Sequence, residues 1–149
     1  MTALRPKSGG PCRAEPWSPS VARILVVEDN PANMTLAVFL LESAGHTVLS
    51  ATNAEAGLTL ARDQQPHLIL MDIQLPGMDG LEATGLLKKA DTTRAIPVIA
   101  LTALAMKGDE ERIRAAGCDG YIAKPMRYQE FLTTIAARLA EHEPQSPRR

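Results

Sequence analysis

Short apolar runs alternate with longer amphipathic segments through the middle of the chain. The runs have the length and composition of strands, and their bounds are Arg23–Val27, Thr47–Ala51, His67–Met71, Pro97–Leu101 and Tyr121–Ala123. They are almost wholly apolar, which is typical of strands that are covered on both faces of a sheet. Strands that alternate with helices of about 10 to 15 residues predict βαβ units and a parallel sheet.

Capping and turn residues predict where the helices begin and end. Asn30 can cap a first helix that has Pro31 at its first position, and Gly45 ends this helix after about Ala44. Asn53 can cap a second helix that runs to about Gln64. The other predicted helices are Leu81–Lys89, Asp109–Ala116 and Tyr128–Glu141.

The two ends of the chain differ from its middle. Residues 1–21 contain four prolines, a Gly9-Gly10 pair and no hydrophobic period, so we predict a disordered N-terminal arm. Residues 142–149 predict a disordered C-terminal tail. One domain, residues 22–141, remains between them.

Composition excludes several classes of function. The chain has 149 residues and a net charge of −1, without the basic patch of a nucleic-acid-binding protein. None of its apolar stretches approaches the length of a membrane span, and its N-terminus has no apolar export segment. Cys12 and Cys118 do not form a disulfide framework, which favours a cytoplasmic location.

Polar residues follow four of the five predicted strands, at the point where each of the four ends. They are Glu28, Asp29, Asp72, Thr102 and Lys124. Because ligands of open parallel α/β sheets bind outside the carboxyl ends of the strands, these side chains should converge in one cleft. Three close acids need a cation, and oxygen ligands favour Mg²⁺. A lysine and a threonine beside these acids indicate that a phosphoryl group is a second ligand of the site.

Individual residues in this set have candidate roles. Asp72 follows a rigid strand and precedes a Pro-Gly loop, and a carboxylate can act as a nucleophile that forms an acyl phosphate. We expect Asp29 to coordinate the metal directly and Glu28 to act through a water. Each residue also has a plainer interpretation, since Asp72 alone fits a solvated strand end and Lys124 alone fits a surface lysine. Asp72 together with the Glu28-Asp29 pair and Lys124 favours a phosphoryl-accepting metal site over these plainer interpretations.

The combination of Glu28-Asp29-Asn30, Met71–Gly80, Ala100–Ala103 and Lys124-Pro125 closely resembles the receiver domain of bacterial response regulators. Thr102 lies 30 residues after Asp72 and Lys124 lies 52 after it, spacings that suit that family. The resemblance spans roughly residues 22–141. It implies an α/β, flavodoxin-like (βα)5 fold, with a five-stranded parallel sheet of order 2-1-3-4-5 and helices on both faces.

The resemblance also implies a site. Asp72 would accept a phosphoryl group from a histidine kinase or a histidine phosphotransfer protein. Mg²⁺ would be bound by Asp29, Asp72 and the backbone carbonyl of Gln74, with Glu28 acting through a water. The residues implied in phosphoryl binding and switching are Thr102, Ala103, Lys124 and Tyr121, the last as an aromatic switch that turns inward when Thr102 moves.

A narrower likeness concerns residues 105–114 with Gly117-Cys118, which resemble DivK-type single-domain response regulators and the receivers of hybrid histidine kinases. The receiver resemblance as a whole implies a phosphoryl-accepting switch with self-catalysed phosphotransfer and autodephosphorylation, rather than a conventional enzyme. Such a switch signals to a downstream protein target through protein contacts. The residues expected on partner surfaces are Asn30, Met106, Arg114, Met126 and Arg127.

Three rival functions are less well supported by the residues. An aspartyl phosphatase places a second Asp two residues after its nucleophile, where this chain has Gln74. A flavin or nucleotide binder needs a phosphate-binding loop after the first strand, where Glu28 and Asp29 would repel phosphate in the absence of a metal. A DNA-binding regulator needs a second domain, and eight residues after Glu141 do not supply one.

Overall fold

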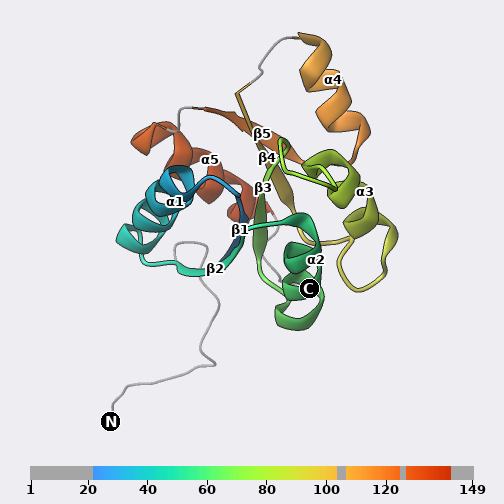
Figure 1. The fold of residues 1–149 in the computed structure, drawn as a ribbon. Coiled ribbons are helices and arrows are strands. Elements are labelled where there is room, and N and C mark those ends of the chain that lie inside the picture. Colours follow the sequence, from blue (N-terminus) through green and yellow to red (C-terminus); the bar gives the residue numbers. More distant parts are fainter. Residues whose placement is uncertain (1–21, 104–106, 125–126, 142–149) are drawn as a thin grey trace.

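A computed structural model describes residues 22–103, 107–124 and 127–141. Its centre is a five-stranded parallel sheet of order β2-β1-β3-β4-β5 (Figure 1). The strands are β1 Arg23–Val27, β2 Thr47–Ala51, β3 Leu68–Asp72, β4 Val98–Thr102 and β5 Gly120–Ala123. The predicted flavodoxin-like order 2-1-3-4-5 is confirmed.

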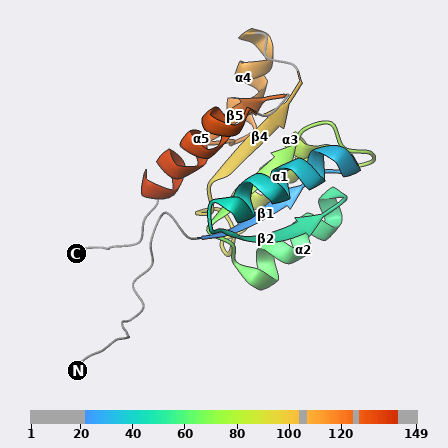
Figure 2. The same ribbon diagram turned by 90° about the vertical axis from the view of Figure 1, so that its left-hand side faces the viewer.

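Helices cover both faces of the sheet. The helices α1 Pro31–Ser43 and α5 Tyr128–Glu141 pack on one face, and α2 Ala54–Gln64, α3 Gly80–Lys89 and α4 Lys107–Ala115 lie on the other (Figures 1 and 2). Alternate residues of each strand feed two separate apolar clusters, because successive side chains point to opposite faces. The strand side chains of β3 and β4 are buried along their whole length, as the apolar runs predict.

Side-chain caps set most of the helix starts. The side chain of Asn30 accepts a hydrogen bond from the backbone N–H of Asn33 at 3.0 Å, and Asn53 accepts one from Ala56 at 2.8 Å. Both predicted caps are confirmed. Helix α3 begins one residue before the predicted position because the carboxylate of Asp79 caps it. Helix α4 begins at Lys107, two residues before the predicted start. Its first turn includes Gly108, which costs only about 1 kcal/mol relative to alanine and so does not prevent the earlier start.

Several sequence predictions concern residues outside the described ranges. These are the N-terminal arm at 1–21, the C-terminal tail at 142–149, Met106, Pro125 and Met126. The domain itself begins and ends on one side of the sheet. Residue Ala22 leads into the amino end of β1, and α5 runs back from the carboxyl edge of the sheet to the amino edge (Figure 2).

Two histidines fix the amino end of β1. The backbone N–H of Ala22 donates to Nδ1 of His46 at 3.1 Å, and that of Arg23 donates to Nδ1 of His67 at 3.0 Å. A ring nitrogen accepts a hydrogen bond only when it carries no proton. Burial lowers the pKa of both histidines, and the Arg23 charge lowers that of His67 further. The fold therefore favours the neutral imidazoles.

This arrangement predicts a loss of stability in mild acid. The unfolded chain, with a His pKa near 6.5, binds more protons than the folded chain wherever the folded pKa is lower. The stabilisation is therefore complete above pH 6.5 and is lost as the pH falls through the folded pKa. His46→Leu leaves the Ala22 N–H unpaired and should cost about 1–3 kcal/mol at pH 7.5. Urea unfolding at pH 7.5 and 5.5 should show this cost shrinking, and an equal cost at both values contradicts the assignment.

Candidate functional site

The carboxyl edge of the sheet brings the predicted polar residues together. Asp72 is the last residue of β3, and Glu28 directly follows the neighbouring strand β1. Lys124 directly follows β5, where its backbone N–H donates to the carbonyl of Thr102 at 2.7 Å. These backbone positions are set by the sheet, so the side chains need little loop structure to meet.

One ammonium lies between two buried carboxylates. Lys124 Nζ is 3.0 Å from Glu28 Oε1 and 3.2 Å from Asp72 Oδ2. The side chains of Glu28 and Asp72 are only 1% and 3% exposed, and that of Lys124 is 14% exposed. Two buried carboxylates therefore share one ammonium, which leaves the cluster with an excess of negative charge.

Backbone donors orient the two carboxylates. The N–H of Gln74 donates to Asp72 Oδ1 at 3.0 Å, and the N–H of Asn30 donates to Glu28 Oε2 at 3.2 Å. Glu28 Oε1 is fully buried and accepts no hydrogen bond from the described residues, although Lys124 lies within ion-pair distance. Burial raises the pKa of Glu28, and the neighbouring Asp72 carboxylate raises it further.

The acidic cluster has the donor set of a divalent-cation site. One carboxylate oxygen from each of Glu28, Asp29 and Asp72 lies within 4.8 Å of the others. Asp29 is exposed, whereas the other two are buried, so a cation would approach from the Asp29 side. Carboxylate oxygens suit Mg²⁺, and three acids beside one ammonium leave excess negative charge that such an ion would neutralise. These residues therefore fit a magnesium ion.

The cluster opens into a cleft of about 410 Å³. Its lining residues are Glu28, Asp29, Asn30, Pro31, Asn33, Asp72, Gln74, Ala103 and Lys124. The cleft thus unites seven of the residues that the sequence singled out. Thr102 is fully buried at the end of β4, next to this cleft in the chain. A cleft of this size has room for a phosphoryl group and hydrated metal.

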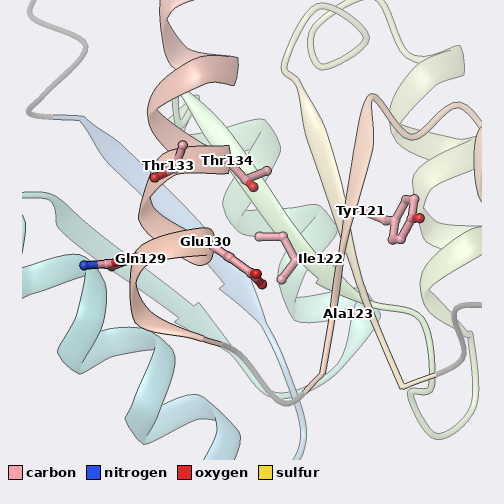
Figure 3. Close-up of a pocket in the computed structure, with 7 residues that line it drawn as sticks. All are labelled: Tyr121, Ile122, Ala123, Gln129, Glu130, Thr133 and Thr134. Carbon is pink, nitrogen blue, oxygen red and sulfur yellow. The ribbon is translucent and has the colours of Figure 1, made fainter.

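Tyr121 lies apart from the cleft. Its hydroxyl donates to Glu110 Oε2 at 2.7 Å, and this bond is the main cause that raises the tyrosine pKa. Its ring projects from β5 on the side away from α5 (Figure 3). Arg114 and Arg127, two of the residues predicted on partner surfaces, are exposed. A cavity of about 500 Å³ lies between β5 and α5 and includes Tyr121 in its lining.

Sequence reasoning missed the role of Gly80. A Cβ at this position would lie 2.2 Å from the carbonyl oxygen of Asp72 and 2.7 Å from Cα of Ile73. The first turn of α3 therefore rests directly on the backbone of the central acid. The only sequence signal is an Asp-Gly pair at a helix start, which looks like an ordinary turn.

The comparisons with known proteins now decide the family. The sequence model of the response regulator receiver domain matches residues 24–136. The chain belongs to the response regulator receiver family. Receiver domains are phosphoryl-accepting switches of two-component signalling, so the predicted family and its function are confirmed.

Relatives of this receiver are found among single-domain response regulators. It is 51% identical over 118 residues to the polar-differentiation response regulator DivK of Brucella anthropi, which covers 79% of this chain and 96% of the relative. Identity to DivK of Brucella abortus strain 2308 is 49% over the same length and coverage.

Solved structures agree with this assignment. The receiver domain of the sensor histidine kinase PA1611 from Pseudomonas aeruginosa PAO1 has a TM-score of 0.75 and 36% identity, over 80% of this chain and 98% of its own. That structure holds a magnesium ion in its active-site cleft. A CheY-like receiver from Methanospirillum hungatei JF-1 has a TM-score of 0.76 and 32% identity, over 83% of this chain and 97% of its own. None of the helices in the described part of the chain combines the length and the apolar composition of a membrane span.

Proposed function

We propose that this receiver acts as a single-domain response regulator and that Asp72 is its phosphoryl acceptor. The main support for this proposal is the position of the Asp72 carboxylate, which is buried at the end of β3. Lys124 Nζ lies 3.2 Å from one of its oxygens, and the backbone nitrogen of Gln74 lies 3.0 Å from the other. A strand end fixes the nucleophile, and the open cleft admits the donor. The donor is the phosphohistidine of a histidine kinase or a histidine phosphotransfer protein.

The proposed reaction is an in-line displacement at phosphorus. A carboxylate oxygen of Asp72 attacks the phosphorus, the P–N bond to the donor imidazole breaks, and its electron pair stays on the ring nitrogen. Lys124 already contacts Asp72 and can follow the negative charge onto the phosphoryl oxygens. The hydroxyl of Thr102 and the backbone N–H of Ala103 hold the remaining oxygens. Attack by water later releases inorganic phosphate and restores the carboxylate.

The magnesium ligands are proposed to be Asp29, Asp72 and the backbone carbonyl of Gln74, with Glu28 acting through a water. When bound, Mg²⁺ supplies positive charge that offsets the repulsion between these acids and the incoming phosphoryl oxygens. The cluster within 4.8 Å and the magnesium-bearing receiver of PA1611 support this ligand set.

The surface around the cleft has a composition that suits contact with a protein. Helix α1 begins directly after Asn30, and residues 31–41 of this helix carry no charged side chain. Leu36 and Phe39 are 36% and 65% exposed on its outer side. A partly apolar face that borders the cleft suits a protein donor better than a small phosphorylated metabolite. Arg114 and Arg127, with Met106 and Met126, are proposed to contact the downstream target.

The test of this proposal is phosphorylation of the parent protein and of Asp72→Asn. With a small phosphodonor and Mg²⁺, the parent should gain an acid-stable, base-labile phosphoryl group, and it should bind beryllofluoride as a stable mimic. Asp72→Asn should lose both, since an amide lacks the nucleophilic oxygen. Mass spectrometry and NMR report the two results. Phosphorylation that persists on the folded Asp72→Asn protein contradicts the assignment.

The metal assignment predicts unequal effects of the two adjacent acids. Asp29→Ala should weaken Mg²⁺ binding by at least about tenfold, because it removes a direct carboxylate ligand. Glu28→Gln should weaken it less, since a neutral amide can still hold a bridging water. Mg²⁺ titrations followed by amide chemical shifts measure both. The ligand set is wrong if Asp29→Ala binds Mg²⁺ as the parent does.

A further inference from the structure

Helix α4 has few contacts that fix it to the rest of the domain. Among its described side chains, Ile113 alone is buried, and its neighbours in the helix are charged or small. The helix stands beyond β5 at the periphery of the molecule (Figure 1). A helix with one buried side chain has little packing energy to hold its position, so individual polar contacts count for more.

Besides the buried Ile113 side chain, a hydrogen bond from Tyr121 of β5 holds α4 to the domain. The tyrosine hydroxyl donates to Glu110 Oε2 at 2.7 Å, and both residues are half-buried. This length is typical of a hydrogen bond to a charged acceptor, which is stronger than one between neutral groups. The bond therefore ties the outward position of the ring to the position of α4.

The same sheet face connects Tyr121 to the cleft. In the β4–β5 pairing, Tyr121 lies opposite Ala100 and Ala123 lies opposite Thr102. Because alternate strand residues share a face, these four side chains lie on one face of the sheet. The two alanines between Tyr121 and Thr102 are small. A ring that left Glu110 could therefore move over this face toward Thr102.

We propose that Glu110 is a latch that holds Tyr121 outward and so opposes the phosphoryl-bound state of the receiver. The proposal rests on the proposed function and assigns Glu110 a regulatory role at the same site. Movement of the ring toward Thr102 breaks the bond to Glu110, so α4 loses this tie to β5 at the same moment. The receiver resemblance implies that the ring turns inward when Thr102 moves, so a phosphoryl mimic that requires this inward state must overcome the latch, which lowers the apparent affinity of the mimic.

The experiment measures beryllofluoride affinity at saturating Mg²⁺ in matched variants. Glu110→Ala and Tyr121→Phe each remove one half of the bond, and each should bind about three- to tenfold more tightly than its reference. The reference for Glu110→Ala is Glu111→Ala, which removes the same charge from an exposed neighbouring position. The reference for Tyr121→Phe is the parent. The double variant should gain no more than either single variant, because only one bond is removed.

The outcomes separate the latch from the acceptor assignment. Equal affinity in Glu110→Ala and Glu111→Ala, or full additivity in the double variant, overturns the latch while beryllofluoride binding by the parent still supports Asp72. If the parent fails to bind beryllofluoride, or Asp72→Asn binds it equally well, the proposed function fails. Amide shifts of α4 that change in Glu110→Ala without beryllofluoride are expected, since the helix has lost a tie.

Discussion

Gly80→Ala is expected to destabilise the protein by about 3 kcal/mol, the upper range for an added methyl group that has no space. The new Cβ would lie 2.2 Å from the Asp72 carbonyl oxygen and 2.7 Å from Ile73 Cα. Both neighbours are backbone atoms at a strand end, so no flexible side chain can move aside. The strain must shift either the first turn of α3 or Asp72, the proposed acceptor.

The matched control is Gly85→Ala in the same helix. A Cβ there meets nothing within 4 Å, and alanine favours helix by up to about 1 kcal/mol over glycine. Urea unfolding should therefore move in opposite directions for the two variants. Beryllofluoride binding should also weaken in Gly80→Ala and stay unchanged in Gly85→Ala. Equal stability of the two variants would show that the contact at Gly80 relaxes without cost.

Lys124→Met is expected to destabilise the metal-free protein by about 3 kcal/mol at pH 7. Removing one partner of a buried ion pair costs about 3–5 kcal/mol, and the partial exposure of Lys124 places this change at the lower end. The variant leaves Glu28 and Asp72 as two buried carboxylates without their shared cation. Their repulsion then adds to the cost of their burial.

Two comparisons test the cause of this loss. Lys89→Met, at an exposed position, should change stability by no more than about 0.5 kcal/mol. Mg²⁺ should recover more stability in Lys124→Met than in the parent, because the ion replaces the missing charge beside the same carboxylates. Thermal unfolding with and without Mg²⁺ measures both. A Lys124→Met protein as stable as the parent without metal would refute the shared-cation account.

The sequence was sufficient for the parts of the site that the backbone sets. Strand ends on one edge of a parallel sheet bring Glu28, Asp72 and Lys124 together whatever the side chains do in detail. The strand order, by contrast, came from the family resemblance, since alternation alone is compatible with several orders. The helix starts at Asn30 and Asn53 followed from local capping chemistry.

Contacts between distant segments were beyond sequence reasoning. The bond between Tyr121 and Glu110 depends on where α4 lies, and no local pattern encodes that position. The contact of Gly80 with the Asp72 backbone depends on how a loop of seven intervening residues folds back. His46 shows the same limit, because it is buried where its ring accepts a hydrogen bond from the backbone of Ala22, which is 24 residues away in the chain.

The position of the two ends of the domain has a practical consequence. Ala22 and the last turn of α5 both lie at the amino edge of the sheet, and the cleft lies at the carboxyl edge (Figure 2). A biotin tag or fusion partner joined directly to either end of the domain is therefore attached on the side opposite the cleft. Immobilised on a sensor surface in this way, the receiver should present Asp72 to a kinase in solution.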